Sequence, residues 1–101
     1  MTKSSKEPPG RANPAEYAKG HRARMRGKLL EKGTAALTEL EILEMLLYAG
    51  APRGDTKPLA KRLIKTFKSL SAVLRASPDD LRPIKDMGDA AIAAVKIAEA
   101  A

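Results

Sequence analysis

The sequence predicts an all-α domain, a small bundle of about five to six helices. Apolar residues recur at helical spacing along most of the chain, and residues typical of helix starts and stops bracket these segments. No stretch combines sustained alternation of apolar and polar residues with turn residues at its ends, so no strand is predicted. At 101 residues the chain has room for one small domain and not for a larger catalytic architecture.

The first predicted helix covers residues 21–32 and is basic and amphipathic, ending before Gly33. Its apolar residues at helical spacing are Met25, Leu29 and Leu30. Gly27 in its interior costs about 1 kcal/mol relative to alanine, so the helix is expected to depend on docking. Residues 1–20 are rich in Pro, Gly, Ser and Lys and have no long apolar run. They predict a disordered basic arm, and neither a signal peptide nor a membrane span.

The second predicted helix, residues 38–50, is marked at both ends. Thr38 followed three residues later by Glu41 matches a capping box, and Gly50 takes the position of a left-handed C-cap. Its apolar residues are Leu40, Ile42, Leu43, Met45, Leu46 and Leu47. The narrow polar stripe that remains consists of Glu41, Glu44 and Tyr48. This helix is therefore predicted to be the most buried element.

The third predicted helix, residues 55–68, separates apolar from basic residues. Asp55 is a good N-cap, and Pro58 is tolerated because it lies in the first turn. One face carries Leu59, Leu63, Ile64 and Phe67. Another face carries Lys57, Lys61, Lys65 and Lys68, joined by Arg62.

The last third of the chain predicts two short helices and one longer helix. Ser69 caps a segment that ends at residue 76, and Ser77 followed by Pro78 starts the next one. A hairpin follows, made of Lys85, Asp86, Met87, Gly88 and Asp89, and it leads into an Ala-rich, helix-favouring segment. Two helices joined by a short Gly-containing loop fit a helix-hairpin-helix over residues 77–101. The same plan recurs over residues 38–68.

A glycine before a helix start is a place where a phosphate can dock, because free N–H groups and the helix dipole face an anion. Here the contact would use the backbone amides of Gly88 and Asp89. The carboxylates of Asp86 and Asp89 oppose an anion at the same place. The hairpin is therefore interpreted mainly as a structural corner, with a retained phosphate contact as the alternative.

Charge is distributed in alternating blocks within a net charge of +7. Residues 1–33 and 53–76 each carry +6, whereas residues 34–52 carry −3 and residues 77–101 carry −2. The basic blocks suit a polyanionic partner. The candidate DNA-binding residues are Arg22, Arg24, Arg26, Lys28, Lys57, Lys61, Arg62, Lys65 and Lys68. The alternative is a solvated face that only keeps the protein soluble, and the sequence leaves open whether both blocks share one surface.

Any DNA binding is expected to be directed at the backbone and independent of sequence. Three aromatic residues are too few and too scattered for base stacking, and no helix places Arg, Asn and Gln to read base edges. The absence of Cys excludes disulfides and thiolate metal sites, and His21 alone cannot form an ordinary zinc site. Between a pH switch or base and a helix-start residue, the second interpretation of His21 is favoured. No cofactor and no small-molecule ligand are expected.

Four motifs precede the hairpin in a fixed order: GHRARMRGKLLEKG, LTELEILEMLLYAG, KPLAKRLIKTF and LSAVLRASPDDL. With the hairpin sequence KDMG, they make residues 20–101 resemble the N-terminal domain of the RadC family. The resemblance implies a paired helix-hairpin-helix bundle of the SAM/RuvA-C type. In full-length members it implies an attached JAB/MPN-type zinc metalloprotease-like domain. One His cannot supply that domain's metal ligands, so the chain is expected to be an excised or naturally truncated N-terminal module, with zinc only in the absent domain.

The sequence departs from the family at the hairpin. Asp86 replaces the first glycine of the family's Gly-hydrophobic-Gly turn, and Ala91 stands where a lysine is often found. Asp tolerates positive φ better than most residues, so the turn is expected to survive at a cost of about 1 kcal/mol. Affinity for phosphate is expected to suffer more than the turn does.

Three functional hypotheses follow. The first is a non-catalytic module that binds double-stranded or branched DNA through its backbone, which the resemblance extends to DNA repair or recombination. The second is a protein-interaction domain that positions the metalloprotease-like domain. The third, part of an enzyme whose chemistry lies beyond residue 101, is compatible with either. The chain is expected to be cytoplasmic, without a membrane partner and without hydrolase activity of its own.

Overall fold

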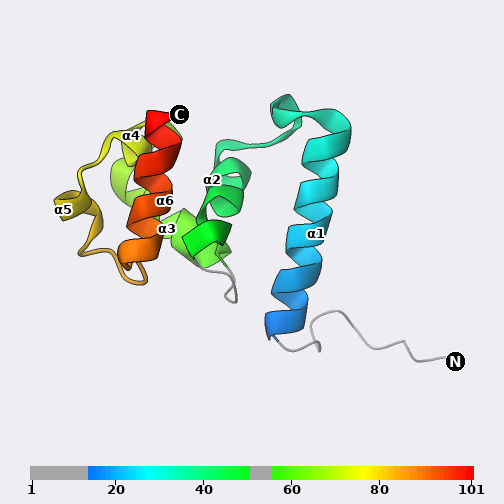
Figure 1. Cartoon of the computed structure of the whole chain (residues 1–101), viewed down its shortest axis with the longest axis horizontal. Helices are drawn as coiled ribbons and strands as arrows, with labels where there is room; N and C mark the ends of the chain where they lie inside the picture. The colour runs from blue at the N-terminus through cyan, green and yellow to red at the C-terminus, as the bar shows by residue number, and fades with distance from the viewer. Residues whose placement is uncertain (1–13, 51–55) are drawn as a thin grey trace, which may run out of the picture.

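The computed structural model describes residues 14–50 and 56–101, with side chains from residue 19 onward (Figure 1). Every regular element in these residues is helical, which confirms the predicted all-α class. The elements are α1 Pro14–Lys32, η2 Thr34–Ala36, α2 Glu39–Leu47, η3 Tyr48–Gly50, α3 Lys57–Phe67, α4 Leu70–Arg75, α5 Pro78–Leu81 and α6 Asp89–Ala100. The η elements are single 3₁₀ turns.

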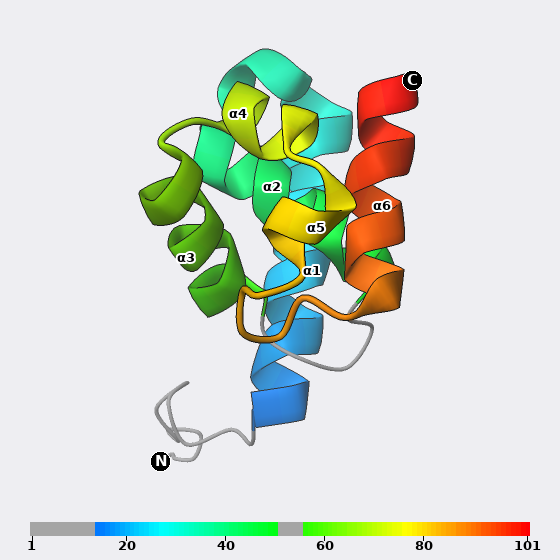
Figure 2. The ribbon, with the colours of Figure 1, turned by 90° about the vertical axis from the view of Figure 1, so that its left-hand side faces the viewer.

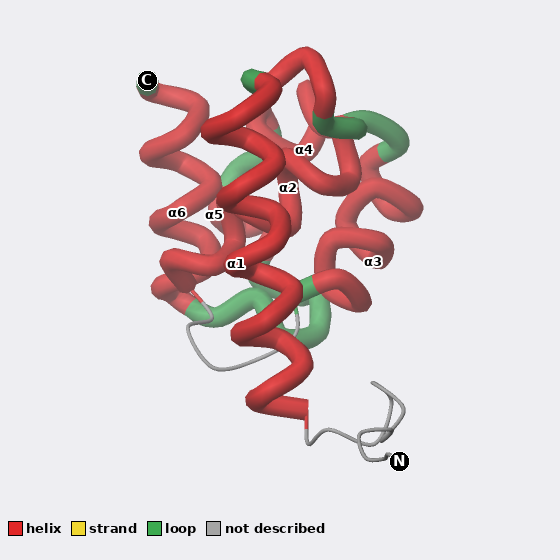
Figure 3. Tube along the Cα trace, turned by 90° about the vertical axis from the view of Figure 1, so that its right-hand side faces the viewer, coloured by secondary structure: helices red, strands yellow, loops and turns green. Residues whose placement is uncertain are grey.

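The core forms around α2, which packs against α1, α3, α4 and α6. The opposite views in Figures 2 and 3 both place α2 between α3 and α6. Its Leu43 and Leu47 are fully buried, as are Leu63 of α3 and Val95 of α6. The prediction that residues 38–50 form the most buried element is consistent with this packing. Burial of several complete apolar side chains, each worth about 1.5 to 3 kcal/mol, provides the main stabilisation.

Local capping signals set most helix ends as predicted. The Thr38 hydroxyl accepts from the Glu41 amide at 3.1 Å, and the Glu41 carboxylate accepts from the Thr38 amide at 2.9 Å, which completes the capping box. Ser69 and Ser77 cap α4 and α5 in the same way, each at 3.1 Å. Pro58 and Pro78 lie in the first turns of their helices.

The first helix begins earlier than predicted. It starts at Pro14, not at His21, so residues 14–20 belong to α1 and not to a disordered arm. Proline fits the first position of a helix because it needs no amide partner there, and the following Ala and Glu residues favour helix. The rest of the predicted arm, residues 1–13, lies outside the described residues.

Gly50 does not act as the predicted left-handed C-cap. The last α-helical residue of α2 is Leu47, and Tyr48–Gly50 continue as a 3₁₀ turn. Among the described residues, positive φ occurs at Gly33, Lys68 and Asp86. Gly50 is needed for another reason: a Cβ atom there would lie 2.5 Å from the Cα of Ala91. Glycine therefore allows η3 to lie directly against α6.

The ammonium group of Lys96 holds the end of α4 against α6. Its Nζ donates to the carbonyl oxygens of Leu74 at 3.0 Å and Ala76 at 2.8 Å, and it pairs with Glu99 at 2.6 Å. The last carbonyls of a helix have no partner within the helix, and a cation satisfies them well.

We therefore expect Lys96→Met to lower the free energy of unfolding by about 1.5 kcal/mol, because two carbonyl groups lose a charged donor. Methionine keeps the apolar stem, so packing changes little. Urea denaturation monitored by circular dichroism measures the effect, and Glu99→Gln serves as the control because it removes the ion pair and leaves both carbonyl contacts in place. Equal stability of Lys96→Met and wild type would contradict this capping role.

Candidate nucleic-acid interface

Helix α3 presents three exposed lysines, Lys57, Lys61 and Lys65, and a fourth exposed lysine, Lys68, follows at its C-cap; these four are called the lysine row. From Lys57 to Lys65 the helical part of the row extends about 12 Å along the axis, at 1.5 Å per residue. On the opposite side of α3, Leu59, Ala60 and Leu63 are buried in the core and fix the orientation of the helix. The sequence of α3 contains no Asp or Glu.

The two ends of α3 differ from the prediction. The N-cap position is Thr56, and the predicted cap Asp55 lies outside the described residues. Thr56 makes no side-chain cap; its hydroxyl donates instead to the backbone carbonyl of Glu44 at 3.1 Å. At the other end, Lys68 is left-handed with φ 85, and its amide closes the helix on the carbonyl of Ile64. Thr56 and Lys68 thus fix the length of the lysine row.

Arg62 differs from the four lysines because it is tied to the hairpin. Its guanidinium donates to a carboxylate oxygen of Asp86 at 2.8 Å and to the carbonyl oxygen of Lys85 at 3.2 Å. Asp86 holds a left-handed backbone with φ 72, as its place in the turn predicts. The pair joins α3 to the hairpin and neutralises the charge of Arg62.

The rest of the hairpin makes its own contacts. Asp89, at the first position of α6, pairs with Arg82 at 2.7 Å, and Gly88 precedes it in extended conformation. Met87 is buried beneath the turn. Helix α5, the first half of the predicted helix-hairpin-helix, is a single turn of four residues.

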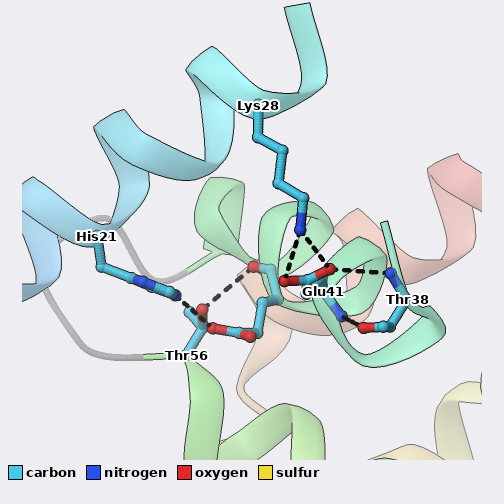
Figure 4. A network of polar contacts seen from close by, with 6 residues as sticks. His21, Lys28, Thr38, Glu41 and Thr56 are labelled. Atoms are coloured by element: carbon cyan, nitrogen blue, oxygen red, sulfur yellow. Dashed lines mark hydrogen bonds and ion pairs between the residues drawn. The ribbon is translucent and has the colours of Figure 1, made fainter. Parts of the chain in front are cut away.

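The basic residues of α1 divide into two groups. Arg24 and Arg26 are exposed. Arg22 lies over the Tyr48 ring, 4.5 Å from its centroid, and Lys28 Nζ lies 3.3 Å from a carboxylate oxygen of Glu41. Figure 4 shows the Lys28 side chain reaching from α1 toward Glu41. Arg22 and Lys28 therefore face the protein's own α2 and η3.

His21 and Glu44 are both placed differently from the prediction. His21 lies well inside α1, and its Nε2 is 3.0 Å from a carboxylate oxygen of Glu44 (Figure 4). Glu44, predicted to lie on a polar stripe, is only 2% exposed. The docking of α1 covers it, and His21 supplies the polar partner that a buried carboxylate needs.

The two basic blocks lie on different sides of α2. In Figure 3, α1 crosses the front of the molecule while α3 lies to the right, and both helices pack against α2. The exposed row on α3 is the denser of the two sets of exposed cations.

Comparisons with known proteins identify the family of this domain. The family model described as UPF0758 N-terminal matches residues 19–93. The chain belongs to the UPF0758 family. This membership confirms the resemblance to the N-terminal domain of the RadC family. No solved structure matches the chain.

Several UPF0758 proteins are similar to the chain. One from Ruegeria pomeroyi is 42% identical over 84 residues, covering 83% of this chain and 38% of that protein. One from Fusobacterium nucleatum is 46% identical over 78 residues, covering 77% and 34%. One from Rhodobacter capsulatus is 40% identical over 77 residues, covering 76% and 36%. The chain thus spans about a third of the length of the curated relatives it matches.

No described helix is both long and apolar enough to cross a membrane. Within residues 14–50 and 56–101, no three His, Asp or Glu side chains lie together as a metal site would require.

Glu41 makes the stability of the α2 start depend on pH. The hydrogen bond from the Thr38 amide, aided by Lys28, lowers the pKa of Glu41 below its usual value. A carboxyl group whose pKa is lowered by folding stabilises the folded state at pH values above its usual pKa. This contribution is lost as the pH falls through the lowered pKa.

We expect Glu41→Gln to be less stable than wild type at pH 7 and to approach it as the pH falls below about 4. Glutamine can still cap, so the difference reports the charge. Urea midpoints measured between pH 3 and 7 check this. A difference that stays constant over the range would contradict it.

Proposed function

We propose that the chain is a non-catalytic module that binds the backbone of nucleic-acid duplexes without sequence specificity. The observation that carries this proposal is the lysine row, four exposed cations on α3 and its C-cap, a segment that contains no acidic residue. Cations of this kind displace the counterions condensed on phosphates, and the released counterions drive association. The exposed Arg24 and Arg26 add to the same field.

The chemistry of the row favours duplexes over single strands. The one aromatic residue of α3, Phe67, packs against the core and is not offered for base stacking. The α3 sequence also has no Asn or Gln, the residues that pair with adenine edges. A cytoplasmic role at duplex or branched DNA, in repair or recombination, fits this proposal and the family resemblance.

A fluorescence-anisotropy titration tests the proposal. Labelled duplex, single-stranded and branched DNA are titrated with the chain between 50 and 300 mM salt. The logarithm of the affinity for duplex is expected to fall against the logarithm of salt with a slope of about −3 to −4, as about four phosphate contacts require. Two duplexes of unrelated sequence should bind equally. Absence of binding at 50 mM salt would overturn the proposal.

A second candidate is a domain that positions the remainder of the longer family members. The observation in its favour is Ile97 of α6, a large apolar side chain that is 71% exposed. Ala93 and Ala90 lie four and seven residues earlier on the same exposed side. Calorimetric titration against the separately produced remainder of the Ruegeria pomeroyi relative, with wild type and Ile97→Glu, tests it. Binding that Ile97→Glu abolishes would favour this role, and absence of binding would count against it.

A further inference from the structure

Helix α1 is joined to the rest of the domain with little apolar contact. Of its described side chains, residues 19–32, only Met25 is buried. The main core cluster draws its side chains from α2 to α6 and the segments between them, and Met25 does not belong to it. Elements with few buried apolar contacts open at a lower free energy than the core.

Polar and charged contacts hold α1 against α2 and η3, where apolar contact is sparse. Residues 19–32 contain six Lys and Arg and one Glu, while α2 contains three Glu and no cation. Three contacts between described residues join the two sides: His21 with Glu44, Lys28 with Glu41, and Arg22 with the Tyr48 ring. In each contact, α1 contributes the His, Lys or Arg side chain, and α2 or η3 contributes the carboxylate or the aromatic ring.

The core keeps its own contacts without α1. Glu41 retains the capping box with Thr38, and the Glu44 carbonyl retains the Thr56 hydroxyl. Gly33, with φ 82 and open space where a Cβ would be, separates α1 from η2. Undocking therefore needs a change at one glycine joint and leaves the capping of α2 intact.

We propose that α1 is a charge-held latch that opens as a unit, and that the acidic side of α2 competes with a bound polyanion for Arg22 and Lys28. The second half of this inference rests on the proposed function. In the docked state two of the predicted binding cations are occupied internally, and in the open state they face solvent. Salt weakens the partly exposed Lys28–Glu41 contact of the latch.

Hydrogen exchange measured by mass spectrometry tests the latch without any nucleic acid. In wild type, peptides from residues 19–32 are expected to exchange at least tenfold faster than peptides from α2 and α6, and faster still in 1 M salt. Glu41→Gln with Glu44→Gln should accelerate exchange in α1 about tenfold, and by more than it accelerates exchange in α6. The control, Asp79→Asn with Asp80→Asn, changes net charge equally on exposed residues of α5 and should leave α1 unchanged. Exchange of α1 at the rate of the core, insensitive to salt, would overturn the latch.

A duplex titration tests the competition. If α2 and the polyanion compete, Glu41→Gln with Glu44→Gln binds duplex at least threefold more tightly than the Asp79→Asn, Asp80→Asn control. Equal affinities of the two charge-matched variants would refute competition. If neither variant nor wild type binds duplex at 50 mM salt, the proposed function fails, and the exchange experiment still decides the latch.

Discussion

Replacing Gly50 with alanine is expected to lower the free energy of unfolding by about 2 to 3 kcal/mol, in the upper part of the range for overpacking a tight site. The added methyl would lie 2.5 Å from the Cα and 2.6 Å from the amide nitrogen of Ala91. These are backbone atoms of α6, so no side-chain rotation relieves the overlap. Relief requires α6 to move away from η3, which would loosen Ile92 and Val95 in the core.

Urea unfolding followed by circular dichroism measures this loss. Gly27→Ala is the matched control, because it is the same substitution inside a helix at a position with open space around the added atom. It is expected to leave stability unchanged or to raise it by about 0.5 to 1 kcal/mol. A Gly50→Ala protein as stable as wild type would show that η3 and α6 are not in close contact.

Helix ends that depend on neighbouring residues could be predicted from the sequence. The Thr38 and Glu41 capping box involves residues three positions apart, and Ser69 and Ser77 act on amides three positions away. Such signals are local, so tertiary structure does not alter them. The left-handed backbone of Asp86 was predictable for the same reason, because the turn itself demands it.

Features that depend on contacts between helices could not be predicted in this way. Gly50 carries the usual mark of a C-cap, and only the packing of α6 reveals its other role. Glu44 has a polar side chain in a position that α2 alone would expose, and α1 covers it. His21 becomes its partner because α1 extends back to Pro14 and docks along α2.

The helical spacing of the basic residues was predictable from the sequence, and their contacts with other parts of the chain were not. Sequence spacing correctly placed Lys57, Lys61 and Lys65 on one side of an amphipathic helix. It gave no indication that Arg62 and Lys28 would pair with Asp86 and Glu41, because those partners lie 24 and 13 residues away. Acidic residues elsewhere in the chain thus pair with part of the basic blocks, while Lys61 and Lys65 of the lysine row are exposed.

Charge reversal in the middle of that row is expected to have the largest effect on binding. Lys61→Glu with Lys65→Glu should weaken duplex affinity about 100-fold at 100 mM salt, roughly 2.7 kcal/mol. Two contacts with DNA phosphates are lost, and two carboxylates are brought toward the negatively charged DNA backbone. The salt slope should become shallower by about 2, because fewer counterions are released. Both side chains are exposed, so the fold should persist, which circular dichroism verifies.

The matched control reverses Lys32 and Arg75, two exposed cations that are not on α3, and alters net charge by the same amount. If binding depends on the lysine row, the affinity of this control for duplex falls about tenfold or less, and the slope of its affinity against salt stays near that of wild type. If both double variants lose affinity equally, overall charge governs binding and the lysine row is not the site. The comparison therefore separates a located interface from diffuse attraction by a protein of net charge +7.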